Sequence, residues 1–321
     1  MPPKRVLVTG ASGFIGRWSV PPLLRAGYEV HAVLREAANR RVPQEIRGAK
    51  LHHADLLEDS ALDSLMESIA PTHLLHFAWI ATPGVYWDSA DNFRWLAASR
   101  HLLRSFHRYG GTRAVMAGSC AEYDWSRAQV CDEFATPLAN DSGTTSAYAA
   151  CKIELQRALH EFGSREHLST AWGRIFFQFG PHERPDRLVP SVIRNLLSNR
   201  EAPCSHGRQI RSFLHVADVG AAFAAVLDSE LEGPVNIGSA DRIALGELVE
   251  LIAGQIGRPE LVRLGALPAP AQEPPLLLPE LHRLHDRTRW RPRFTLSAGL
   301  GDTIDWWRSQ LLEKTSAASA P

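Results

Sequence analysis

Residues 6–20 read VLVTGASGFIGRWSV, with glycines at positions 10, 13 and 16. A strand-like apolar run precedes the glycines, and a stretch of helical periodicity, 14–26, follows them. In such a unit Gly10 permits the tight turn, Gly13 lets a pyrophosphate approach the backbone, and Gly16 allows close helix–strand packing. The helix N-terminus adds amides and partial positive charge. The stretch therefore predicts a dinucleotide-binding turn.

Composition narrows the class of protein. The 321 residues carry 35 Lys+Arg and 35 Asp+Glu, so no global field favours nucleic acid. The four cysteines show no CxxC pairing, and the N-terminus lacks a signal peptide's apolar core. No apolar run approaches the roughly 18 residues that a membrane span requires. We expect a cytoplasmic protein with no nucleic-acid or membrane partner.

Short apolar strands alternate with helical stretches through the first half of the chain. This alternation is typical of a parallel sheet covered on both faces. The expected strands are Arg5–Thr9, Glu29–Leu34, Lys50–His53, Thr72–Phe77 and Arg113–Ala117, and the expected helices include Asp59–Ile69 and Asp91–Tyr109.

The predicted fold is α/β, with a doubly wound parallel (Rossmann) sheet and a smaller C-terminal substrate-binding lobe. Residues 1–178 would form the dinucleotide-binding domain, to which segments near 213–240 return. Residues 179–314 would form mainly the substrate-binding lobe. A disordered tail is expected at 315–321.

The end of the second strand bears on the cofactor. An acidic residue there would hold the ribose hydroxyls of NAD, but this chain has Arg35, with Arg40 and Arg41 close behind. A guanidinium suits a 2′-phosphate, so NADP(H) is favoured and NAD(H) stays possible; a solvated arginine is the alternative. Asp55 could reach the adenine amino group or cap the next helix. The remaining expected cofactor contacts are Ser12, Phe14, Ile15, Leu56, Phe77 and Ala78.

The segment TTSAYAACK supplies candidate catalytic groups. Tyr148 and Lys152 lie four residues apart in a helical stretch and point from one face. The lysine ammonium is expected to lower the pKa of the phenol, which could then exchange a proton with a carbinol or ketone. Ser119, just after an expected strand, could hold the substrate oxygen. The alternative for the Tyr–Lys pair is a surface helix pair without function.

Several motifs in order resemble the extended short-chain dehydrogenase/reductases, in the nucleotide-sugar epimerase/dehydratase/reductase group. They are TGASGFIG, GSCAEYDW, YAACK, GRIFFQFGPH, RSFLHVADV and VNIGS. The resemblance implies a catalytic triad of Ser119, Tyr148 and Lys152. It also implies that Asn92 supports the active-site backbone beside the cofactor, and that Arg211 contacts the nucleotide's phosphate or ribose.

Departures from the group's motifs narrow the chemistry that the resemblance implies. Cys120 and Ala121 replace the acidic pair of the dehydratases, and Glu122 is offset by one and should point elsewhere. Dehydration is therefore not expected. His182 matches the histidine of epimerases that pair it with a cysteine, but Cys120 is one place off. We therefore interpret His182 as a substrate-pocket residue, with a loop histidine without a role as the alternative.

Other substrate contacts are expected from the same resemblance. Phe177 replaces the group's substrate-contacting asparagine, which suggests a less polar wall. Trp79 falls in the group's substrate loop, although packing is an equal alternative. Arg187 lies beside the expected diphosphate path, or is solvated at the surface. The histidines lack ligand spacing, so no metal is expected.

The favoured function is NADPH-dependent reduction of a 4-keto-(6-deoxy)hexose carried on a nucleoside diphosphate. The alternatives are a nucleotide-sugar 4-epimerase with tightly bound NAD, a reductase of a non-nucleotide ketone, and a non-catalytic NADP(H) sensor. The resemblance also implies a homodimer through a four-helix bundle formed by Asp91–Tyr109 and Ser146–Phe162.

Overall fold

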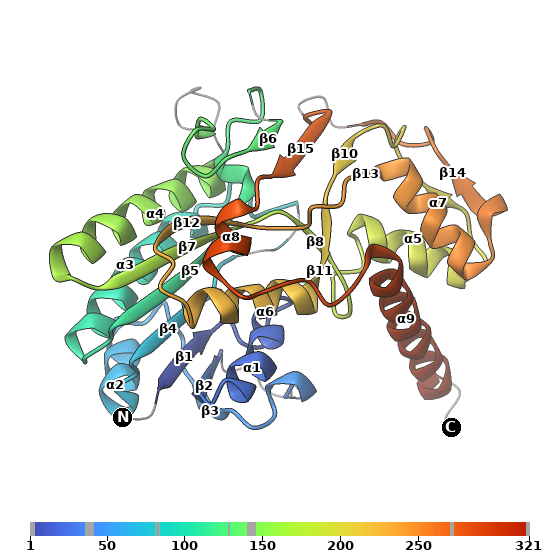
Figure 1. The fold of residues 1–321 in the computed structure, drawn as a ribbon. Coiled ribbons are helices and arrows are strands. Elements are labelled where there is room, and N and C mark those ends of the chain that lie inside the picture. Colours follow the sequence, from blue (N-terminus) through green and yellow to red (C-terminus); the bar gives the residue numbers. More distant parts are fainter. Residues whose placement is uncertain are drawn as a thin grey trace.

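The computed structural model describes residues 4–35, 42–80, 82, 84–127, 129–139, 146–269 and 273–318. A seven-stranded sheet forms the centre of the molecule, in the order β12-β7-β5-β4-β1-β2-β3 (Figure 1). All of its neighbouring strands pair in parallel. The strands are β1 (Arg5–Thr9), β2 (Glu29–Leu34), β3 (Lys50–His53), β4 (His73–His76), β5 (Arg113–Ser119), β7 (Ser169–Ile175) and β12 (Gly233–Ile237). The predicted doubly wound fold is confirmed.

Helices cover both faces of the sheet. Side chains alternate along each strand, so Val6 and Val8 join the core under α1 and α6, whereas Leu7 joins the opposite core under α2, α3 and α4. Burial on both faces explains why the inner strands are mostly apolar, whereas the edge strand β3 is largely exposed and contains Lys50, His52 and His53. The helices are α1 (Gly16–Arg25), α2 (Asp59–Ile69), α3 (Asp91–Arg108), α4 (Ala147–Glu166) and α6 (Val216–Leu227).

A second, smaller lobe is built mostly from the later chain around its own core (Figure 1). Its helices are α5 (Leu188–Leu197), α7 (Leu245–Ile256) and α9 (Leu296–Ala318), whereas α8 (His282–Arg287) packs beside β12 and joins the core under α1 and α6 through Leu284. Its strands are β6 (Val130–Cys131), β8 (Phe177–Phe179), β9 (Ala202–Pro203), β10 (Ile210–Arg211), β11 (Phe213–His215), β13 (Ile243–Ala244), β14 (Val262–Arg263) and β15 (Leu276–Pro279). The 3₁₀ turns among the described residues are η1 (Gln44–Ile46), η2 (Cys120–Glu122) and η4 (Pro259–Leu261).

Two expectations about element ends need correction. Helix α9 continues to Ala318, so residues 315–318 are helical and the tail expected from 315 is wrong there; residues 319–321 lie outside the described residues. No proline or glycine interrupts 302–318, and each added helical residue gains a backbone hydrogen bond. Strand β5 runs to Ser119, so this residue ends the strand instead of following it. The division at 178/179 stays a prediction.

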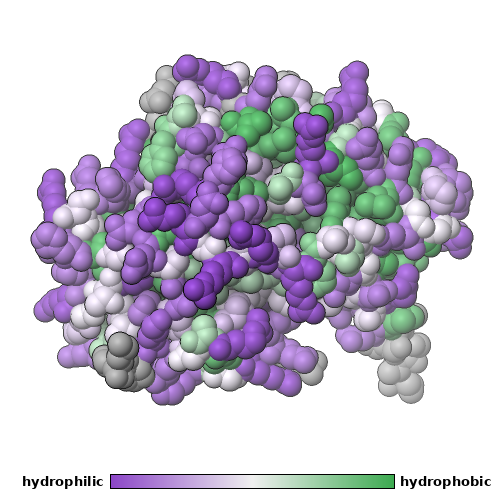
Figure 2. Space-filling view, in the orientation of Figure 1, coloured by the Kyte–Doolittle hydropathy of each residue, from purple (hydrophilic) through white to green (hydrophobic). Residues whose placement is uncertain are grey.

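The surface is mixed in polarity. Figure 2 shows a mostly hydrophilic face, on which hydrophobic residues gather over the small sheet containing β10, β13 and β15. None of the helices in the described part of the chain combines the length and apolar character needed to cross a membrane.

Candidate active site

The glycine turn between β1 and α1 is a tight cradle of bare backbone. Gly10 has a φ of +66°, and a Cβ there would lie 2.8 Å from the backbone nitrogen of Ala78. A Cβ on Gly16 would lie 2.2 Å from the carbonyl oxygen of Gly10, and Gly13 N–H donates to that oxygen at 2.9 Å. No side chain caps the N-terminus of α1 at Ile15. The turn therefore fits a pyrophosphate held by backbone amides.

Arg17 borders this turn, and the sequence argument missed it. Its Nε donates to the carbonyl oxygen of Gly13 at 3.0 Å, and its Nη2 to that of Ser12 at 2.6 Å. Glu45 of η1 lies 3.8 Å from Nη1. Burial lowers the pKa of Arg17. The only sequence signal is a guanidinium directly after the third glycine.

The remaining expected cofactor contacts surround the carboxyl ends of the strands. Arg35 is exposed directly after β2, whereas Arg40 and Arg41 lie outside the described residues. Asp55 accepts a hydrogen bond from Leu57 N–H at 3.0 Å, and Glu58 occupies the N-cap of α2. Asp55 therefore shapes the turn before α2 and does not cap the helix. The others are half-buried Phe14, Phe77 and Ala78 and buried Leu56.

Ser119, Tyr148 and Lys152 converge at the carboxyl end of β5. The Ser119 side chain lies close enough to Tyr148 to lower the pKa of its phenol. Lys152, one turn along α4, donates from Nζ to the carbonyl oxygen of Ala117 at 2.8 Å. The carboxyl end of a parallel sheet is where ligands bind in this fold class, so the three groups lie where a substrate carbonyl would be held.

The pKa of Tyr148 departs from the sequence expectation. Burial raises the pKa of Tyr148, whereas the neighbouring Ser119 side chain lowers it by a smaller amount. The lysine ammonium lies 5.9 Å from the Tyr148 ring centroid but only 3.9 Å from that of Trp79. The expected lowering of the Tyr148 pKa is therefore wrong, because burial has the largest effect on this phenol and raises its pKa. Burial also lowers the pKa of Lys152 to about 7.

Asn92 and Trp79 form the support behind the lysine. Trp79 Nε1 donates to Asn92 Oδ1 at 2.9 Å. The Asn92 amide donates to the carbonyl oxygens of Tyr86 at 2.6 Å and Ser89 at 2.9 Å. These contacts of the fully buried Asn92 fix the 86–89 segment, and the Tyr86 ring packs edge-on against Tyr148 with 4.9 Å between centroids. Asn92 and Trp79 thus contact protein groups of the site.

Of the expected substrate residues, Arg211 lies beside Phe177, and Arg187 lies beside Tyr86. Arg211, fully buried on β10, donates to Glu273 at 3.1 Å and to the carbonyl oxygen of Pro274 at 2.7 Å. Its guanidinium lies 5.2 Å from the Phe177 ring centroid, and its buried Nε has no partner among the described residues. The Arg187 guanidinium acts on Tyr86, whose pKa it lowers against the larger raising effect of burial. Arg211 therefore offers an unused donor beside an aromatic wall.

His182 lies apart from these groups. Its Nε2 hydrogen-bonds with Glu45 at 2.9 Å, and its ring centroid lies 4.6 Å from that of Trp306 in α9. It adopts a φ of +71°. The structure thus places His182 where η1 meets α9, in contact with Glu45 and Trp306.

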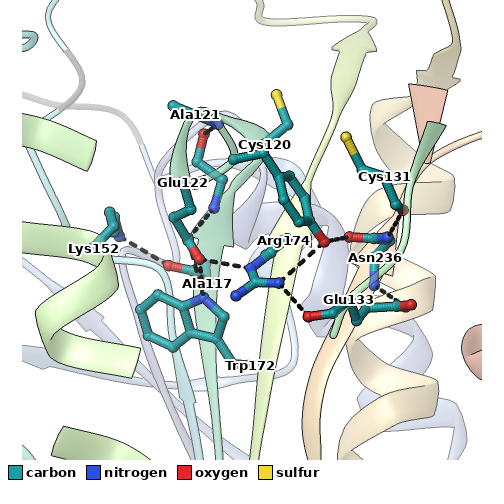
Figure 3. A network of polar contacts seen from close by, with 12 residues as sticks. Ala117, Cys120, Ala121, Glu122, Cys131, Glu133, Lys152, Trp172, Arg174 and Asn236 are labelled. Atoms are coloured by element: carbon teal, nitrogen blue, oxygen red, sulfur yellow. Dashed lines mark hydrogen bonds and ion pairs between the residues drawn. The ribbon is translucent and has the colours of Figure 1, made fainter. Parts of the chain in front are cut away.

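The segment after Ser119 contains the residues that differ from the motifs of the nucleotide-sugar group. Cys120 is buried, and burial raises the pKa of its thiol to about 12, so it is a poor proton donor or base. Glu122 points into the interior toward Arg174 and Trp172 (Figure 3). Within the described residues, no three His, Cys, Asp or Glu side chains could hold a metal ion together.

Comparison with known proteins supports the resemblance seen in the motifs. A model of the NAD dependent epimerase/dehydratase family matches residues 6–238. The chain is 27% identical to dTDP-4-dehydro-6-deoxy-D-allose reductase from Streptomyces bikiniensis, over 95% of this chain and 96% of that protein. It is 23% identical to UDP-glucose 4-epimerase from Corynebacterium glutamicum, over 91% and 92% of the two chains.

A solved structure gives the same picture. The complex of the UDP-glucose 4-epimerase from Thermus thermophilus with NAD aligns with a TM-score of 0.81 at 25% identity, covering 95% of this chain and 99% of that one. The similarity extends over both lobes.

Proposed function

The chain belongs to the NAD dependent epimerase/dehydratase family, and from that premise we propose that it reduces the keto group of a nucleoside-diphosphate 4-keto-(6-deoxy)hexose with NADPH. It is an oxidoreductase-type enzyme of the short-chain dehydrogenase/reductase group. The observation that carries the proposal is the convergence of Ser119, Tyr148 and Lys152 at the end of β5, where Ser119 acts on the Tyr148 phenol and Lys152 donates to the carbonyl oxygen of Ala117. The similarity to a reductase of a dTDP-linked 4-dehydro-6-deoxy sugar supports the substrate class.

The chain's own residues account for the proton side of this reduction. A nicotinamide cofactor bound on the glycine turn would supply hydride to the keto carbon. Tyr148 donates its proton to the keto oxygen, Ser119 orients that oxygen, and Lys152 would hold the cofactor ribose. Because burial raises the pKa of Tyr148, the phenol stays protonated near neutral pH, which is the form that a reduction consumes.

Dehydration and epimerisation by side-chain acid–base pairs find no support here. Cys120 and Ala121 occupy the places of the acidic pair, and Glu122 is bound to Arg174 in the interior. We assign Arg211 and Arg187 to the diphosphate, and Phe177, Trp79 and His182 to the walls and borders of the sugar pocket. Arg211's unpartnered Nε supports its assignment.

The preference for NADPH is proposed from Arg35, with Arg17 as a second guanidinium beside the turn. Arg35→Asp should weaken NADPH binding about tenfold or more and leave NADH binding unchanged or improved. The measurement is the Kd of each cofactor by fluorescence titration, and Arg47→Asp, another exposed arginine, is the matched control. Turnover is then followed as NADPH oxidation with a dTDP-linked 4-keto-6-deoxyhexose. Protein that purifies with tightly bound NAD would instead favour the 4-epimerase.

We also propose a cytoplasmic homodimer. Cys120, Cys131, Cys151 and Cys204 are all free thiols, which suits a reducing compartment. Helices α3 and α4 pack side by side and present a shared outer face, which would form the four-helix bundle with a second copy.

A further inference from the structure

Glu122 is a buried carboxylate that the proposed reaction does not use. Its side chain is fully buried beneath the segment that carries Ser119. It accepts hydrogen bonds from Ser119 N–H at 2.7 Å, from Trp172 Nε1 at 2.9 Å and from Arg174 Nε at 2.8 Å (Figure 3). An ionised group so placed is costly unless it is paired and hydrogen-bonded, and here it is both.

The contact with Ser119 fixes the end of β5. A Cβ on Gly118 would lie 2.2 Å from Trp172 Nε1 and 2.4 Å from Glu122 Oε1, so the backbone is pressed directly onto the carboxylate. Ala121 N–H donates to Ser119 Oγ at 3.2 Å on the other side. Ser119 is therefore held from both its backbone and its side chain, which limits where its hydroxyl can point.

Arg174 connects this carboxylate to the second lobe. Its Nη1 donates to the hydroxyl of Tyr123 at 3.0 Å and to the carbonyl oxygen of Glu133 at 2.9 Å. Tyr123 in turn donates to Asn236 Oδ1 at 2.8 Å. The network joins β5, β7 and β12 of the main sheet to the segment that contains Glu133 (Figure 3).

The same carboxylate acts electrostatically on Lys152, whose ammonium lies 5.8 Å from the centroid of the Trp172 ring that donates its Nε1–H to Glu122. Burial lowers the pKa of this lysine, and the negative charge of Glu122 opposes that shift. The other titratable groups acting on or facing Lys152 are His76 on β4 and Cys151 and Tyr148 on α4. His76 has a pKa lowered to about 3 by burial, so it stays neutral, and the pKa of Cys151 is raised by burial. Glu122 is thus the anion that supports the ammonium.

We propose that Glu122 is a positioning residue, which fixes Ser119 through its backbone N–H and keeps Lys152 in the ammonium form. The proposal rests on the oxidoreductase role proposed for Ser119, Tyr148 and Lys152. Its first test therefore reads the lysine directly and needs no turnover.

The chain has four lysines, at positions 4, 50, 152 and 314, so protein labelled with ¹³C at lysine Cε gives few signals. Lys152→Met assigns the signal of interest. In Glu122→Gln, which keeps an oxygen for Ser119 N–H but removes the charge, the measured pKa of Lys152 should fall by about one unit. An unchanged Lys152 pKa in a folded Glu122→Gln protein overturns the electrostatic role.

Glu133→Gln is the matched control, because Glu133 is a buried carboxylate on the far side of Arg174 that accepts from Asn236 N–H at 2.8 Å. It should leave the Lys152 pKa unchanged; a fall equal to that of Glu122→Gln contradicts the proposal. Glu122→Gln leaves the Arg174 guanidinium unpaired, so Glu122→Gln/Arg174→Met, which buries neither charge, replaces it if the single variant does not fold.

Turnover gives the second readout. Glu122→Gln and the double variant should lower kcat for NADPH oxidation about tenfold and move the alkaline limb of the pH profile downward, with KM for NADPH unchanged. A loss confined to stability, with an unshifted pH profile, would reduce Glu122 to a structural role. Absence of turnover in the wild type with every 4-keto sugar tested counts against the proposed function alone, since the NMR result stands independently.

Discussion

The ammonium of Lys152 lies 3.9 Å from the ring centroid of Trp79, on which it rests while donating to the carbonyl oxygen of Ala117 at 2.8 Å. The lysine is almost completely buried, and burial lowers its pKa from 10.5 to about 7. A ring face and a carbonyl oxygen both favour the charged form, yet neither replaces bulk water. The site therefore keeps a cation that is poised to lose its proton near neutral pH.

Linkage predicts how this lysine affects stability. Between pH 7 and 10.5 the unfolded chain binds a proton at this site that the folded chain has released, so the free energy of unfolding rises with pH in that window. Below pH 7 both states are protonated and the slope vanishes. Urea unfolding should show wild type gaining about 2 kcal/mol relative to Lys152→Met between pH 7 and 9. Lys50→Met, at an exposed lysine, should run parallel to wild type; equal slopes for Lys152→Met and wild type contradict the assignment.

Trp79 is expected to tune the same group. Trp79→Leu removes the ring and should lower the pKa of Lys152 further, by about half a unit to one unit. The loss of activity with rising pH should then begin at a pH that is lower by the same amount. Trp79→Phe keeps a ring but loses the N–H donated to Asn92. It should retain most of the wild-type pH profile while loosening the 86–89 segment. The check is kcat against pH for NADPH-dependent reduction, and coincident profiles for Trp79→Leu and wild type count against the cation–π role.

Tyr148→Phe separates proton donation from binding. Removing the hydroxyl should reduce kcat by about 10²- to 10⁴-fold, because it removes the proton donor proposed for the keto oxygen. The Kd for NADPH should stay near wild type. Tyr86→Phe, which changes the neighbouring ring in the same way, should cost far less. Substantial turnover by Tyr148→Phe would assign the proton to another group.

Local sequence patterns predicted helix α2 and the glycine turn. Helix α2 begins and ends where expected, because Leu62, Leu65, Met66 and Ile69 follow the helical period and all four are buried. The glycine spacing likewise predicted the turn, since each glycine is required by a contact a few residues away or with the next strand. Features of this kind can be predicted because they depend on the spacing of residues that are close together in the sequence.

The site's wider contacts could not be predicted in the same way. Glu122 and Arg174 are 52 positions apart, and Arg211 and Glu273 are 62 apart. Which way Glu122 points depends on the 3₁₀ turn η2, where a shift of one residue changes the direction of the side chain. His182 pairs with a glutamate 137 positions earlier. These pairings follow from sheet order and lobe packing, which spacing along the chain does not encode.

Gly16 and Gly254 offer a test of the turn that needs no activity assay. Gly16→Ala forces a Cβ to 2.2 Å from the Gly10 carbonyl oxygen, a backbone atom that cannot move freely, and should destabilise the fold by about 2 kcal/mol or more and abolish NADPH binding. Gly254, in α7, has open space around it, so Gly254→Ala should stabilise by about 0.5–1 kcal/mol. Thermal unfolding of both variants checks the contrast. Normal cofactor binding by Gly16→Ala would mean that the turn can relax.

The homodimer is expected to form on the outer face of α3 and α4. A shallow groove there is lined by Leu103, Ala158 and Phe162, with charged residues at its rim (Arg100, Arg104, Glu161 and Arg165). Ala158 lines this groove, so a long cation at position 158 would obstruct a second copy packed on this face, and Ala158→Arg should convert the expected dimer to a monomer in light scattering coupled to size exclusion. Ala266→Arg, on an exposed turn of the second lobe, should remain dimeric. An Ala158→Arg variant that stays dimeric would place the interface elsewhere. A wild-type protein that is monomeric at every concentration would contradict the proposed dimer.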